Sequence, residues 1–197
     1  MENHLGGLPE HGVLLTGSLE NPVIENRSGK TVIAYVFKTA DQNGYGQFSA
    51  QLLATSMQPA GIPDGGGIYV RGNRVKPSGE GPIVRAALLN VIFADGQIVG
   101  LVDEGPATAL LFESFGKRIK VITEVGLLGK AGAWDQVEAL AKDLTKLSLR
   151  SPSGENSILY FERRVAAARL AQERREKGDA AAAHLAELYS SLPTLWR

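Results

Sequence analysis

The chain has 197 residues, a formal net charge of zero and no cysteine. Zero net charge removes any overall electrostatic attraction to nucleic acid or to an anionic membrane, and the lack of cysteine excludes disulfides, thiolate metal sites and cysteine nucleophiles. The hydrophobic fraction of 44% and the charged fraction of 21% are typical of a globular protein. No apolar run approaches the roughly 20 residues that cross a bilayer, so we expect a soluble protein without a membrane span.

The first half of the chain has the pattern of β-structure. Residues 1–12 are polar and include glycine and proline, which predicts a flexible lead-in without a signal peptide. The segment 31–39 is apolar at successive positions, as in a strand that is covered on both faces. Asp95 and Gly96 form a strong signal for a two-residue hairpin turn. Roughly seven short strands with regular turns indicate an immunoglobulin-like antiparallel β-sandwich over 13–102.

In the second half, apolar side chains recur every third or fourth position, which is the period of an α-helix. The pattern predicts a helical subdomain over 103–197, with helices at about 106–128, 134–147, 158–177 and 179–192. Gly126 and Gly129 are expected to close the first helix. Gly178, in a left-handed conformation, and Asp179, as an N-cap, are expected to join the last two helices as an antiparallel αα-hairpin. The expected fold class is therefore α+β.

Two short motifs resemble functional sites but lack the context that those sites need. Gly29-Lys30-Thr31 is similar to the end of a phosphate-binding loop, but the preceding glycine is missing and a strand follows instead of a helix. A calcium loop that begins at Asp41 would need a glutamate where Leu52 stands. Both motifs are interpreted as turns.

Isolated polar residues also favour structural roles. His4 and His11 lie in the predicted lead-in and His184 has no second histidine at metal-binding spacing, so we expect no metal and no cofactor. Asn90 interrupts an apolar strand face and is expected to make a structural hydrogen bond or to lie at an edge, rather than to contact a ligand.

The predicted helix 158–177 carries a repeated cluster of arginines. The sequence Glu-Arg-Arg occurs at 162–164 and again at 173–175, which is about three helical turns later. Glutamates at ion-pair spacing and the lack of interleaved aromatic residues favour a solvated helix face over a nucleic-acid or acidic-partner patch. The apolar end of the chain is expected to dock on the protein itself, with partner binding as the alternative. The candidate partner-facing residues are Arg163, Arg164, Arg174, Arg175 and Trp196.

Residues 26–35 (NRSGKTVIAY) and 91–100 (VIFADGQIVG) resemble an uncharacterised family of bacterial envelope or exported proteins. The resemblance implies a β-sandwich, attaches no activity and carries over no site residue. It implies export if an upstream signal has been removed, whereas the chain as written predicts a cytoplasmic location. Separately, the last hairpin is similar to one tetratricopeptide unit in its Lys177-Gly178-Asp179 turn and alanine-rich second helix, although such arrays usually need about three units.

These observations favour a non-enzymatic binding or structural module that contacts a protein partner through its helical hairpin, through Trp196 or through loop 58–81. The first alternative is a hydrolase with an unfamiliar site in the Gly- and Pro-rich loops, beside Asp64, Glu80 or Asp103. The second is weak nucleic-acid binding through the arginines of the predicted third helix. The oligomeric state stays open.

Overall fold

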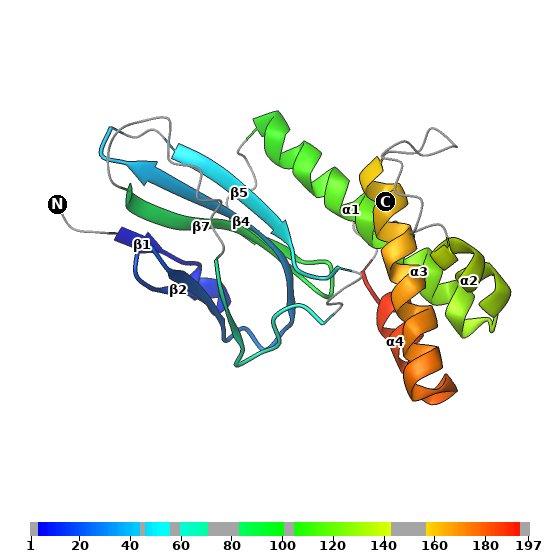
Figure 1. Cartoon of the computed structure of the whole chain (residues 1–197). Coiled ribbons are helices and arrows are strands. Elements are labelled where there is room, and N and C mark those ends of the chain that lie inside the picture. Colours follow the sequence, from blue (N-terminus) through cyan, green and yellow to red (C-terminus); the bar gives the residue numbers. More distant parts are fainter. Residues whose placement is uncertain are drawn as a thin grey trace. The chain divides into compact units, whose positions relative to one another are not determined.

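The computed structural model of the chain describes residues 4–43, 46–55, 60–70, 83–100, 105–142 and 157–193. The chain divides into two compact units, Met1–Leu53 with Ala60–Thr108, and Ala54–Pro59 with Ala109–Arg197. The described part of the first unit is mostly β-structure and that of the second is helical (Figure 1). The protein is thus a mixed α+β structure with two sheets and four α-helices in its described residues.

The first unit contains two sheets. Its elements in chain order are β1 (His4–Gly6), the short 3-10 helix η1 (Pro9–His11), β2 (Val13–Gly17), β3 (Pro22–Asn26), β4 (Val32–Asp41), β5 (Gly46–Leu52), β6 (Gly67–Tyr69), β7 (Ile83–Phe93) and β8 (Ile98–Gly100). One sheet has the order β1-β7-β4-β5, with β8 also paired to β7, and the other has the order β2-β3-β6. Every described pair is antiparallel except β1 with β7, which is parallel. That pair departs from the predicted antiparallel pattern.

The start of the chain also differs from the expectation. Residues 4–12, which we expected to belong to a flexible lead-in over 1–12, form β1 and η1, and Leu5 pairs with Ala86 of β7. Leu8 is buried in the core of the unit and Leu5 packs against that core. The polar composition of this segment obscures the buried Leu8 and the partly buried Leu5, whose packing against the core fixes the position of the segment.

The two sheets enclose one apolar core, which contains side chains from both. The three-stranded sheet contributes Val13, Leu15 and Ile24, and the five-stranded sheet contributes Tyr35, Phe37, Ala86, Leu88, Val91, Phe93 and Val99. All six residues from Val32 to Phe37 are at most 2% exposed. The prediction that this strand is covered on both faces is therefore confirmed.

The second unit consists of helices. They are α1 (Gly105–Lys130), whose residues 105–108 belong to the first unit, α2 (Trp134–Lys142), α3 (Ser157–Lys177) and α4 (Asp179–Ser190). Residues 143–147 of the predicted second helix lie outside the described residues. On α1, Phe115, Ile119 and Ile122 recur every third or fourth position, and all three are buried. No helix in the described part of the chain is both long and apolar enough to cross a membrane.

Gly126 and Gly129 do not close α1, contrary to the expectation. Both lie inside the helix, and Gly132, with a φ of 70°, follows its end. A Cβ atom on Gly126 would lie 2.6 Å from the amide nitrogen of Ser190, and one on Gly129 would lie 2.7 Å from Leu170 Cδ2. These glycines are therefore required for close packing of the helices. Glycine is also the residue that commonly ends a helix, so the sequence alone does not distinguish the two roles.

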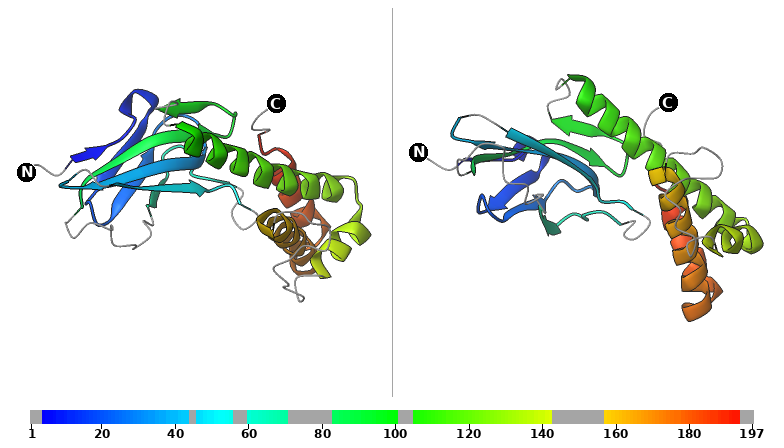
Figure 2. Two further views of the ribbon diagram at one scale, coloured as in Figure 1. Left: turned by 90° about the horizontal axis from the view of Figure 1, so that it is seen from above. Right: turned by 45° about the horizontal axis from the view of Figure 1, so that its top comes forward.

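The core of the second unit contains side chains from all four helices. Its buried members are Ile122, Val125, Val137, Ala166, Ala167, Leu170, Ala171, Ala182, Leu185, Ala186 and Tyr189. α3 packs against both α2 and α4 (Figure 2). The small alanine side chains allow helices to approach closely.

The junction of α3 and α4 is a single residue, Gly178, with a φ of 86°. Gly178 itself occupies the N-cap position of α4, and Asp179 is the first residue of that helix. The expectation that Asp179 caps α4 is therefore wrong. Its carboxylate instead accepts a hydrogen bond from Arg174 Nε at 2.7 Å.

Candidate functional site

The candidate arginines of α3 do not form one exposed patch. Arg163 Nη2 donates a hydrogen bond to Glu124 Oε2 of α1 at 3.1 Å. Arg174 donates to Asp179, and its guanidinium lies 4.5 Å from the centre of the Trp134 ring. Both charges are therefore engaged by partners within the helical unit, which weakens the nucleic-acid alternative.

Arg164 is only 8% exposed, and its guanidinium lies 4.1 Å from the centre of the Tyr160 ring. Burial lowers the pKa of Arg164 from its ordinary value. Low exposure and the stacking on Tyr160 leave Arg164 little surface for a contact, and its role toward a partner stays a prediction. Arg175 is exposed, as expected of a contact residue, and Trp196 lies outside the described residues.

Glu162 also departs from the predicted solvated helix face. It is 5% exposed, and its Oε2 atom accepts hydrogen bonds from Arg118 Nη2 at 2.9 Å and from Arg118 Nε at 3.3 Å. The ion pair joins α1 to α3. The stripe that carries the repeated Glu-Arg-Arg sequence is thus covered by α1 near its beginning and reaches solvent near its end.

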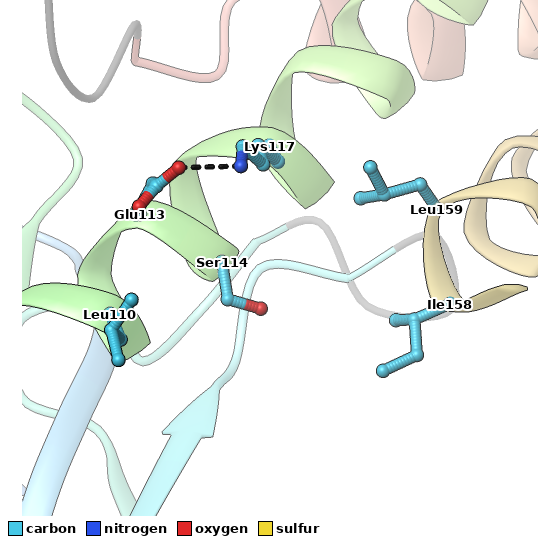
Figure 3. A pocket seen from close by; sticks show the side chains of 6 residues that line it. All are labelled: Leu110, Glu113, Ser114, Lys117, Ile158 and Leu159. Carbon is cyan, nitrogen blue, oxygen red and sulfur yellow. Dashed lines mark ion pairs between the residues drawn. The ribbon is translucent and has the colours of Figure 1, made fainter. Parts of the chain in front are cut away.

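A small hollow lies between residues 110–117 of α1 and the first turn of α3. It has a volume of about 150 Å³ and is lined by Leu110, Glu113, Ser114, Lys117, Ile158 and Leu159. Figure 3 shows Leu110 and Ser114 on one side of the hollow, with Ile158 and Leu159 on the other. Arg118 directly follows Lys117 of the lining, and Glu162 follows Leu159 by three residues, so their ion pair holds the two helices together next to the hollow.

The surface around the hollow is unusually apolar. In the described part of the chain five large hydrophobic side chains are exposed, and Leu110, Ile158 and Phe161 are three of them, at 65%, 54% and 48%. Phe161 follows Ile158 by three residues and therefore shares its face of α3. Exposed apolar side chains that gather in this way are typical of a binding surface.

The charges at the rim of the hollow balance each other. Lys117 Nζ lies 2.5 Å from Glu113 Oε1, one helical turn away on α1, and both side chains are more than half exposed. This ion pair is drawn as the dashed line in Figure 3. The rim therefore presents one positive and one negative group to a partner, beside the apolar side chains of Leu110, Ile158 and Leu159.

The size and the lining of the hollow suit one inserted apolar side chain. Pockets for small molecules usually measure about 300–1,000 Å³, whereas this one measures about 150 Å³. Ser114 has no histidine beside it among the lining residues, so the lining offers no activated nucleophile. Within the described ranges, no group of three or more His, Asp or Glu side chains is placed to hold a metal ion.

The turn at Gly29 and Lys30 has its polar groups occupied by side chains of the first unit. The Gly29 amide donates to Asp64 Oδ1 at 2.9 Å, and Lys30 Nζ binds Asp95 Oδ2 and, at 2.8 Å, Gln97 Oε1. The hydrogen bond from Lys30 lowers the pKa of Asp95. The amide and the ammonium that a phosphate would need thus already bind carboxylates. Asp64, a residue of the hydrolase alternative, has this structural contact.

The other polar candidates are dispersed. The Asn43 amide donates to Asp41 Oδ1 at 2.8 Å, which is the expected turn contact. Asn90 is fully buried within β7. His11 and His184 are exposed and belong to different units, and the side chain of His4 lies outside the described part. Glu80 and Asp103 of the hydrolase alternative also lie outside the described residues.

The sequence interpretation missed Leu110, Ile158 and Phe161. A usable signal is present in the run Ile158-Leu159-Tyr160-Phe161, since four successive apolar or aromatic residues point around most of a helix. A single neighbouring helix covers only one stripe, so part of such a run must face outward.

Comparison with known proteins identifies no relative. No protein-family model matches the chain, and neither a curated protein nor a solved structure matches it. The resemblance of residues 26–35 and 91–100 to bacterial envelope-type proteins stays a prediction. The function is therefore argued from the geometry of the chain itself.

Proposed function

We propose that the protein is a non-enzymatic binding module whose helical unit receives an apolar side chain of a protein partner in the hollow between α1 and α3. The observation that carries the proposal is the exposure of Leu110, at 65%, directly at a hollow large enough for one such side chain. The neutral rim and the three apolar side chains of the lining, Leu110, Ile158 and Leu159, favour a protein surface over a charged small molecule.

The energy available at this surface supports the proposal. Full burial of a large apolar side chain stabilises a complex by about 1.5–3 kcal/mol. Leu110, Ile158 and Phe161 each retain about half of their surface in water, so their burial contributes on the order of 3 kcal/mol together. This is the contribution expected of the central anchor of an interface, around which a larger area of polar contact completes the binding.

A photo-crosslinking residue at position 110 of the full-length chain tests this proposal. We expect a crosslinked protein adduct at position 110 in a lysate of the native host, and a loss of that adduct when Ile158→Glu is added. Leu127 is the matched control position, because it lies on the same helix and is 54% exposed, as Ile158 is. Equal adducts at positions 110 and 127, or an adduct that is insensitive to Ile158→Glu, would contradict the proposal.

We also propose a finer description of the two units. The shared core of the two sheets supports an immunoglobulin-like sandwich for the first unit, with β1 as an additional parallel strand, and is compatible with the bacterial envelope-type resemblance. The one-residue connection at Gly178 and the buried alanines support a tetratricopeptide-like hairpin for α3 and α4. Such a hairpin normally stacks on neighbouring helices, as α3 does on α2.

A further inference from the structure

We infer that the partner at this hollow is a second copy of the same chain, with Phe161 of each copy inserted into the hollow of the other. The inference rests on the proposed function and adds the identity of the partner. A two-fold interface uses the same patch on both copies, so the patch must carry both a projecting group and a cavity that fits it. Residues 110–117 of α1 and 158–161 of α3 together carry both.

The projecting group matches the cavity in size. The hollow measures about 150 Å³, and an apolar protein cavity of about 150 Å³ is known to accommodate a benzene ring. Phe161 is 48% exposed and shares its helix face with Ile158, which lines the hollow. Phe161 therefore lies one helical turn from a residue that lines a hollow large enough for a phenyl ring, and its own ring is about half exposed.

The charges at the rim of the hollow can pair with the same charges of a second copy that is related by a two-fold axis. Glu113 and Lys117 are separated by about one turn along α1. When two α1 helices meet antiparallel, Lys117 of one copy lies near the partner's Glu113, and the reverse contact follows by symmetry. The formal net charge of zero means that two copies approach without overall repulsion.

Sedimentation equilibrium of the full-length chain over a concentration series tests the inference. We expect a reversible dimer whose dissociation constant rises at least about tenfold in Phe161→Glu, as for the loss of a central interface anchor. Leu127→Glu is the matched control and should leave the dissociation constant unchanged. Circular dichroism of each variant verifies that the helices are retained.

A charge exchange provides a second test that needs no apolar substitution. Lys117→Glu alone should weaken the dimer, because it opposes two carboxylates, and the double variant Glu113→Lys with Lys117→Glu should restore it. A restored dimer supports the antiparallel arrangement even if Phe161→Glu does not fold. Failure of the double variant to recover overturns this arrangement.

The outcomes separate this inference from the proposed function. A chain that is monomeric at every concentration overturns the inference. If the monomer still gives a position-110 adduct with a different protein, and Ile158→Glu removes that adduct, the proposed function stands and the partner is not a second copy. A monomer without any specific adduct contradicts both.

Discussion

Substitution of Gly126 by alanine tests how closely α4 must approach α1. The added Cβ would lie 2.6 Å from the amide nitrogen of Ser190, 2.7 Å from Tyr189 Cβ and 2.9 Å from the carbonyl oxygen of Ala186. Two of these neighbours are backbone atoms, which cannot rotate away. The end of α4 must therefore move, and Tyr189 is fully buried in the core that such a movement opens.

Two opposing effects determine the size of the change. Alanine favours the helix over glycine by about 1 kcal/mol, whereas forcing an extra methyl group into a packed core costs about 1–3 kcal/mol. Because the closest contacts are with backbone, the upper part of that cost applies. We expect a net loss of about 1–2 kcal/mol, which lowers the melting temperature by about 2–8 °C for a chain of this length.

Thermal and urea unfolding followed by circular dichroism measure this loss. Leu127→Ala is the control, since Leu127 is 54% exposed on the same helix and its truncation should change stability by about 0.5 kcal/mol or less. Gly129→Ala should be milder than Gly126→Ala, because its closest neighbour is the end of the Leu170 side chain. If Gly126→Ala is as stable as the wild type, the close approach of α4 to α1 is refuted.

Two further predictions concern buried polar groups. Glu162→Gln should destabilise the protein by about 1–3 kcal/mol in urea unfolding, since Arg118 then loses its carboxylate partner; Glu187→Gln, which breaks an exposed pair, should cost at most about 1 kcal/mol. Burial raises the pKa of Tyr35 from 10.0 to about 12. Because the pKa of Tyr35 is higher in the folded than in the unfolded state, the neutral hydroxyl contributes its full share to the free energy of unfolding below pH 10. That contribution is lost as the pH rises from 10 to about 12. Tyr35→Phe should flatten the fall of unfolding free energy over that range, and an unchanged slope would show that Tyr35 ionises freely.

Local periodicity was sufficient to predict the elements that bury their own side chains. The run Val32 to Phe37 has apolar residues at every position, and a strand covered on both faces is the simplest structure that buries them all. In α1 the spacing of Phe115, Ile119 and Ile122 likewise predicts an inward stripe, and all three are buried. In both elements the apolar residues that form the sequence pattern are the residues that are buried in the structure.

The predictions that failed depend on contacts between distant residues. Leu5 and Leu8 have few apolar neighbours in sequence, and their burial depends on strands that lie far along the chain. Gly126 and Gly129 have the composition of a helix end, but Gly126 allows a close contact with α4 and Gly129 allows contacts with α3 and α4, about 40 to 60 residues later. A glycine that ends a helix and a glycine that admits a second helix look alike until the partner is known.

The candidate site also depends on contacts between distant residues, which the sequence alone does not predict. Helical spacing places Arg164 and Arg175, eleven residues apart, on nearly the same stripe of α3, yet one is 8% exposed and the other is exposed. The apolar run that begins at Ile158 exceeds what one neighbouring helix can cover, so an outward apolar group there is expected from sequence alone. The cavity beside this group cannot be predicted from sequence in the same way. Its lining includes Leu110 of α1, and the ion pair between Arg118 and Glu162 holds α1 next to α3. Excess hydrophobicity can thus be read from the chain, but a cavity of definite size exists only once the two helices have packed.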